Sequence, residues 1–296
     1  MFEISNIFAE EHDIPVMSIL ACRILEDEIF HVLSLKNAFD YLFVADTKET
    51  HGLIRRLKTG GTPYTSVPPD RIHDMVRQAG SSWRSNIFRR LFRKKTTDDD
   101  FILVVHILEL GLHRDLKLLR KGVYAAIEQM SVYSDGILLF YGLCGNSFQN
   151  IENDLSDIRC PIYLLRDYED NRVDDCISIA LGGNRKYEKA FEACRGKGSL
   201  FFTPMWASNW KDVDAPGDKQ TDLKTICDSF KRHHISRIVK IERSTRHDPA
   251  FEQNINQFAE MFGLEIMSIP GTTEIVEKCY LDAKNEIMNK YKKAHC

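Results

Sequence analysis

Short, unbroken runs of apolar residues recur along the chain and predict the strands of a buried sheet. They are rich in Ile, Val, Leu and Phe and lack the apolar–polar alternation that is typical of a sheet with one solvent-exposed face. The runs cover residues 14–21, 41–45, 101–108, 136–141, 162–165, 199–203, 237–241 and 264–268. We therefore expect strands buried on both faces, as in a parallel sheet.

Helical patterns lie between these runs. Apolar residues recur every three or four positions at residues 114–130, and again at 249–262 just before Gly263, a typical helix-ending residue. A last helix is expected at about residues 274–293, where lysines suit the negative end of the helix dipole. Strands that alternate with helices predict an α/β fold: a mostly parallel sheet with helices on both faces. We expect a Rossmann-like domain over residues 1–296, built as one body or as two packed lobes.

Residues 50–100 interrupt the alternation, and we expect them to form an insertion outside the core. A turn-rich segment at residues 59–70 leads to a basic segment that runs from Trp83 to Lys95. Written as a helix, this segment gathers its apolar residues on one side and its arginines and lysines on the rest. Such helices dock on acidic partners, nucleic acids or membrane surfaces, and a solvated helix face is the alternative.

Composition narrows the classes of protein. The 296 residues are 43% hydrophobic and 28% charged, and 40 basic against 43 acidic side chains leave a net charge of −3. This balance gives no reason to expect a nucleic-acid partner. We see no apolar stretch long enough to span a bilayer and no signal peptide, so we expect a cytoplasmic protein with reduced thiols.

The candidate chemistry lies directly after the predicted strands. Cys22, His113 and Cys144 each follow a different strand, and Cys176 lies in the loop after the next one. Ligands of open parallel sheets bind at the carboxyl ends of the strands, so these four side chains are expected at one edge. Three thiols and an imidazole form a good zinc donor set, catalytic with an open position or structural when closed. The alternative is that the three cysteines are small buried residues at strand ends. We expect no site role for the other five cysteines, because Cys160 precedes a strand and the rest fall in or near predicted helices.

Neighbouring residues support this candidate site. Gly142 and Gly145 flank Cys144 and would let the backbone approach a ligand or present N–H groups to an anion. Asp174 or Asp175 is expected either to cap the helix that begins near Cys176 or to orient a metal-bound His113. Aromatic residues after a strand, Trp206 and Trp210, are expected to line a pocket for a flat ligand or to pack in the core.

Familiar catalytic motifs are missing from the sequence. We find no G-x-x-x-x-G-K-S/T phosphate loop, no G-x-G-x-x-G after the first strand, no H-E-x-x-H and no G-x-S-x-G. Nucleotide hydrolysis, dehydrogenase and serine-hydrolase functions therefore have no local support.

Several motifs resemble those of one family. ACRILEDEI, LELGLHRDLKLLR, ILLFYGLCGNS, DDCISIALGGNRKYEKAF and SLFFTPMW are similar to segments of an uncharacterised family of methanogenic archaea and some anaerobic bacteria. Before Cys176 this chain has the longer RDYEDNRVDDC where the family tends to P-R-x-x-D-C. The resemblance covers about residues 14–262 and makes Cys22, His113, Cys144 and Cys176 the site residues. Members are often encoded beside corrinoid-dependent methyltransferase systems, which implies a role in one-carbon metabolism.

These observations lead to three expectations of function. The first is a metal-thiolate protein, with zinc as the metal, that transfers a methyl group between a thiol and a corrinoid carried by a partner. The second is a non-enzymatic accessory protein that handles a metal or a corrinoid and docks its partner through the segment Trp83 to Lys95. The third is a metal-free protein in which Cys144 or Cys176 acts as a redox or covalent nucleophile.

Overall fold

Two parallel sheets form the framework of the protein. The computed structural model describes residues 14–81, 100–158, 160–214, 223–243 and 249–295. Within them, six strands pair in the order β3-β2-β4-β1-β5-β6 and three pair in the order β7-β8-β9. The strands are β1 (Val16–Cys22), β2 (Tyr41–Ala45), β3 (Thr65–Val67), β4 (Ile102–Leu108), β5 (Gly136–Phe140), β6 (Ile162–Leu164), β7 (Gly198–Phe202), β8 (Ile235–Arg243) and β9 (Glu265–Gly271).

The helices alternate with these strands. They are η1 (Arg23–Leu25), α1 (Glu26–Leu33), η2 (Lys48–Thr50), α2 (His51–Gly60), η3 (Pro69–Arg71), α3 (Ile72–Ser81), η4 (Leu110–Arg114), α5 (Leu116–Met130), α6 (Ile151–Asp154), α7 (Cys176–Leu181), α8 (Asn184–Ala193), α9 (Pro204–Asp214), α10 (Leu223–Arg232), α11 (Pro249–Phe262) and α12 (Glu274–His295). Every strand pair in the two sheets is parallel. The α/β fold with a mostly parallel sheet is confirmed.

The centre of the larger sheet is fully buried. All seven residues of β1 are buried, and β1 lies between β4 and β5. The polar Ser18 is tolerated there because its hydroxyl bonds to that of Ser134 at 2.6 Å. From β1 the chain runs through α1 to β2 on one side of β1, and from β4 it runs through α5 to β5 on the other side. Because such crossovers are right-handed, α1 and α5 lie on opposite faces of the sheet.

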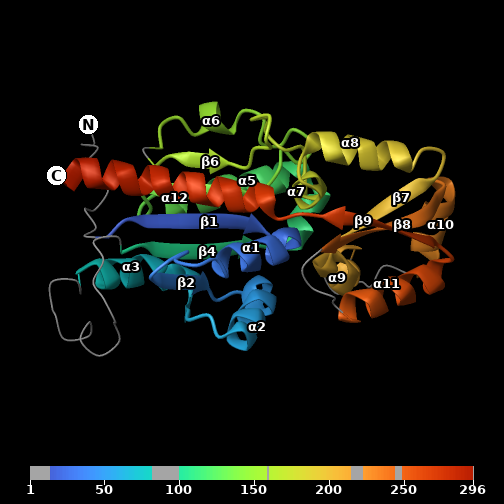
Figure 1. Cartoon of the computed structure of the whole chain (residues 1–296), viewed down its shortest axis with the longest axis horizontal. Coiled ribbons are helices and arrows are strands. Elements are labelled where there is room, and N and C mark those ends of the chain that lie inside the picture. Colours follow the sequence, from blue (N-terminus) through green and yellow to red (C-terminus); the bar gives the residue numbers. More distant parts are fainter. Residues whose placement is uncertain (1–13, 82–99, 159, 215–222, 244–248, 296) are drawn as a thin grey trace, which may run out of the picture.

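The last helix joins the two sheets into one structure. Figure 1 shows β9 leading out of the smaller sheet into α12, which runs back across the larger one. Helix α12 contacts α1, β5 and β6, and its Ile275, Val276, Tyr280, Ala283 and Ile287 are buried in the main core. The smaller sheet, with α9, α10 and α11, is thus inserted between β6 and the helix that completes the larger unit.

Part of the segment 50–100 belongs to the core, which corrects our expectation. Strand β3 pairs with β2, with Phe43 opposite Thr65, and buried Leu53, Leu57 and Val76 pack in the main core. The strand was missed because two of its three residues, Thr65 and Ser66, are polar and exposed and so form no apolar run. The basic segment from Trp83 to Lys95 lies outside the described residues. Over the residues described, no helix combines the length and the apolar character needed to cross a membrane.

Candidate thiol–imidazole site

Four sequence-predicted residues meet at the carboxyl edge of the larger sheet. Cys22 is the last residue of β1, and His113 lies in η4, the turn that follows β4. Cys144 lies in the loop after β5, and Cys176 is the first residue of α7. The parallel topology explains this gathering because β4, β1 and β5 are adjacent and end at the same edge.

The four side chains form one chain of contacts. The thiols of Cys144 and Cys176 lie within hydrogen-bonding reach of each other, and so do those of Cys176 and Cys22. Cys22 Sγ lies 2.9 Å from His113 Nε2. The side chains therefore connect as Cys144, Cys176, Cys22 and His113.

Burial keeps Cys144, Cys176 and His113 uncharged. Cys22, Cys144 and Cys176 are 1%, 7% and 4% exposed. The hydrogen bond to Cys176 and burial raise the pKa of the Cys144 thiol far above its ordinary value. The bond from Cys144 lowers the pKa of Cys176, but the bond to Cys22 and burial outweigh it and leave that pKa raised. Burial lowers the pKa of His113, so its imidazole is neutral at pH 7.

Backbone pairing holds Cys144 against Cys176. Leu143 N donates to Val173 O and Cys144 N to Asp174 O, both at 2.8 Å. A Cβ on Gly142 would lie 2.5 Å from the Cα of Asp175, so only glycine fits at this crossing. These contacts correct our view of the loop: Gly142 admits the protein's own backbone, and the N–H groups of Leu143 and Cys144 are occupied instead of open to an anion.

Cys144 has an unusual backbone conformation. Its φ is 47°, and Gly145 and Asn146 follow with φ of 62° and 69°. A left-handed conformation is strained for a residue with a Cβ and is often kept at functional sites. The Cys144 carbonyl accepts a bond from Ser147 Oγ at 2.8 Å, which helps to hold the turn. Beside it, a Cβ on Gly145 would lie 3.2 Å from Leu116.

Asp175 has a structural role that accounts for its position. It is the N-cap residue of α7, and its Oδ1 accepts from Ser178 N at 2.8 Å. Burial and the nearby Asp175 raise the pKa of Tyr187 to about 12. Of our two interpretations of Asp174 and Asp175, the helix cap is confirmed for Asp175.

Sequence reasoning missed Tyr141, which borders the whole cluster. Its ring stacks on His113 with centroids 6.3 Å apart and an interplanar angle of 15°, and its hydroxyl donates to Ala21 O at 3.2 Å. Burial, followed by the charges that Cys22, Cys176 and Cys144 would carry, raises its pKa well above the ordinary value. Tyr141 thus packs against the imidazole and bonds to the residue before Cys22.

The two tryptophans pack within the protein. Trp206 stacks on Phe202 at 6.0 Å, and Trp210 makes an edge contact with Phe258 at 5.0 Å. Trp206 also packs against the main core. Core packing, the second of our two interpretations, accounts for both rings.

The chemistry of the donor set fits a thiophilic metal ion. Thiolates and a neutral imidazole are preferred zinc ligands. Among the described residues, no three His, Cys, Asp or Glu side chains are already arranged to hold a metal ion. The four side chains lie in a row, so coordination would require them to rotate toward a common centre.

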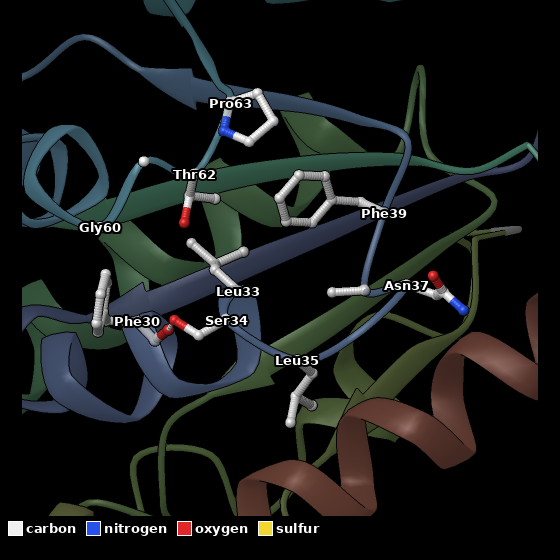
Figure 2. A pocket seen from close by; sticks show the side chains of 11 residues that line it. Phe30, Leu33, Ser34, Leu35, Asn37, Phe39, Gly60, Thr62 and Pro63 are labelled. Carbon is white, nitrogen blue, oxygen red and sulfur yellow. Dashed lines mark hydrogen bonds between the residues drawn. The ribbon is translucent and has the colours of Figure 1, made fainter. Parts of the chain in front are cut away.

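A separate hollow lacks comparable chemistry. Figure 2 shows Phe30, Leu33, Phe39 and Thr62 around a hollow of about 390 Å³, between the end of α1 and the end of α2. Its eleven lining residues include no ionisable side chain. The hollow therefore offers neither a nucleophile nor a charged ligand group.

Comparison with known proteins identifies the family of this chain. No curated protein matches the chain. A family model described as "Protein of unknown function (DUF1638)" matches residues 107–280, more than half of the chain, including His113, Cys144 and Cys176. The chain therefore belongs to the DUF1638 family.

Proposed function

We propose that Cys22, Cys144, Cys176 and His113 bind a thiophilic metal ion, with zinc as the expected metal. The observation that carries the proposal is the continuous contact from Cys144 through Cys176 and Cys22 to His113. Three buried thiols from distant parts of the chain meet an imidazole that is neutral and able to act as a ligand.

The metal would supply a nucleophile at neutral pH. Burial and mutual hydrogen bonding keep the thiols of Cys144 and Cys176 protonated. A bound cation replaces those protons and stabilises the thiolates. Tyr141, stacked on His113, would fix the plane of the imidazole ligand.

The activity that we propose for this site is methyl transfer between a corrinoid protein and a thiol, in anaerobic one-carbon metabolism. It is supported by the motifs that resemble the archaeal and anaerobic family and by the genomic association of that family with corrinoid methyltransferases. The corrinoid would be carried by a partner, with the segment from Trp83 to Lys95 as the proposed contact.

Burial of the thiols favours a second candidate, a non-enzymatic accessory protein that handles a metal or corrinoid. All three thiols are less than one-tenth exposed, and His113 is the one partly exposed member of the four. A catalytic zinc site keeps one position open to substrate, whereas a structural site is closed. Four protein ligands that are this enclosed resemble the closed type.

The Cys22–His113 contact favours a third candidate, a metal-free nucleophile. A thiol and a neutral imidazole within 2.9 Å have the arrangement of a nucleophile and its base. Our sequence-based version of this candidate named Cys144 or Cys176. The geometry favours Cys22, because it is the cysteine that contacts the imidazole.

Elemental analysis of anaerobically purified protein tests the proposal. We expect about one metal ion per chain in the wild type, loss of metal in Cys144→Ser, and full loading in the control Cys160→Ser, which removes another buried thiol. Stoichiometric metal that survives in Cys144→Ser, or its absence from the wild type, would contradict the metal proposal.

Incubation of the metal-loaded protein with a methyl-corrinoid protein and a thiol then separates the first two candidates. Transfer of the methyl group supports the enzyme, and metal without turnover supports the accessory role. Metal-free wild-type protein in which Cys22 alone is rapidly alkylated, and is slowed by His113→Ala, supports the third.

A further inference from the structure

Helix α9 connects the smaller unit to the thiol–imidazole site. It contacts both η1, which directly follows Cys22, and η4, which contains His113. Its Met205 is buried in the main core although the helix follows β7 of the smaller sheet. Figure 1 shows α9 at the junction between the two sheets.

One side chain bridges this junction. Arg23 directly follows Cys22, and its Nη1 donates to Glu49 Oε2 at 3.0 Å while its Nη2 donates to Asn209 Oδ1 at 2.9 Å. Glu49 belongs to η2 of the larger unit and Asn209 to α9. The Arg23 side chain is only 14% exposed, so its charge is shared between these partners in a largely dry contact.

Asn209, the partner of Arg23 on α9, lies where this helix is kinked. Asn209 has φ −129° and ψ 17°, outside the helical range, and its Nδ2 donates to Met205 O at 2.9 Å. Arg23 therefore bonds to α9 at its kink. Asn209 in turn bonds to Met205, the residue of α9 that is buried in the main core.

We propose that Arg23 is a positioning residue that holds α9 over the thiol cluster through Asn209, and that opening of this contact admits reagents to the thiols. The inference rests on the proposed function only in taking the cluster as the functional site. Cys22, Cys144 and Cys176 are almost fully buried, so a small molecule reaches them only after a covering element moves. Helix α9 is that element because it contacts the turns that carry both Cys22 and His113 and is held by side-chain bonds at a break in its own backbone.

Thiol labelling of the full-length, metal-free protein tests the inference. Anaerobic protein is treated with iodoacetamide, and each cysteine is followed by mass spectrometry, with the half-buried Cys227 on α10 as internal reference. Asn209→Ala removes the bond from Arg23 to α9, together with the bond from Asn209 Nδ2 to Met205 O, and leaves the contact between Arg23 and Glu49 in place. Arg23→Lys keeps the charge beside Glu49 but cannot hold both partners as the guanidinium does. Arg195→Lys, in the exposed turn that follows α8, is the matched control.

We expect Asn209→Ala and Arg23→Lys each to raise the labelling rate of the three site thiols about tenfold or more, as loss of a charge-assisted bond does to a local opening. The double variant should label no faster than the faster single variant, because both changes break one contact. Labelling at the wild-type rate in both single variants, or rates that multiply in the double variant, would overturn the inference. So would an equal rise at the buried Cys160, which signals general loosening of the core. No metal is needed for this experiment, so failure of the metal proposal leaves its outcome readable.

Discussion

Cys22 Sγ and His113 Nε2 lie 2.9 Å apart although the two residues are 91 positions apart in the sequence. They meet because Cys22 ends β1 and His113 follows β4, its neighbour in the sheet. The loops after β5 and before α7 bring Cys144 and Cys176 to the same place. The site is thus a property of the strand order, with each functional side chain held at the end of a rigid element.

The backbone strain at Cys144 is measurable apart from any function. With φ at 47°, Cys144→Ala keeps a Cβ in the left-handed region, whereas Cys144→Gly removes it. We expect the glycine variant to be more stable than the alanine variant by about 1 kcal/mol in urea unfolding. Equal stability, or a more stable alanine variant, would show that this turn stores no strain.

The crossing of two backbones at Gly142 predicts a second effect. A Cβ there would overlap the Asp175 backbone, which cannot move without disturbing the cap of α7. We expect Gly142→Ala to lower the free energy of unfolding by roughly 2–4 kcal/mol. The control is Gly111→Ala in η4, where an added Cβ has open space and should change stability little. Similar losses in the two variants would contradict this assignment.

A buried carboxyl group predicts how stability depends on pH. Burial raises the pKa of Glu26 from 4.5 to about 7, against the attraction of Arg56. Because the folded protein holds this proton more tightly than the unfolded chain, the stabilisation is fully present below pH 4.5 and is lost as the pH rises through about 7. We expect Glu26→Gln to be more stable than the wild type at pH 8, by up to about 3 kcal/mol, with little difference at pH 4.5.

Thermal unfolding of both proteins across this pH range measures the effect. Asp27→Asn serves as the control because it removes the ion pair with Arg56 and should lose stability at pH 8. A wild-type-like pH profile in Glu26→Gln would mean that the Glu26 carboxyl is not the group responsible.

Much of the fold follows from local sequence pattern. The unbroken apolar runs predicted every strand of the described residues except β3, since burial on both faces leaves no room for polar alternation. Strand β3 was not predicted because its Thr65 and Ser66 are polar and exposed and its pairing with β2 is short. The same reasoning mistook residues 51–81 for an excursion, because a turn-rich composition does not reveal that Leu53 and Leu57 face the core.

The site was predictable only in outline. The rule that ligands bind at the carboxyl ends of parallel strands placed Cys22, Cys144 and Cys176 at one edge. It did not predict that Tyr141 stacks on His113 or that Arg23 reaches Asn209. Those contacts depend on side-chain packing between elements that are distant in the sequence, and a local sequence pattern does not predict such packing.

Proton release on metal binding tests the central claim most directly. The apo protein is titrated anaerobically with Zn²⁺ at pH 7 in weakly buffered solution, and protons are counted with an indicator dye. Since the thiols of Cys144 and Cys176 are protonated at that pH, coordination must expel their protons. We predict saturable binding with release of two to three protons per zinc ion in the wild type and in Cys160→Ser, and neither saturable binding nor proton release in Cys144→Ser. Binding without proton release, or no saturable binding, would contradict a metal-thiolate site.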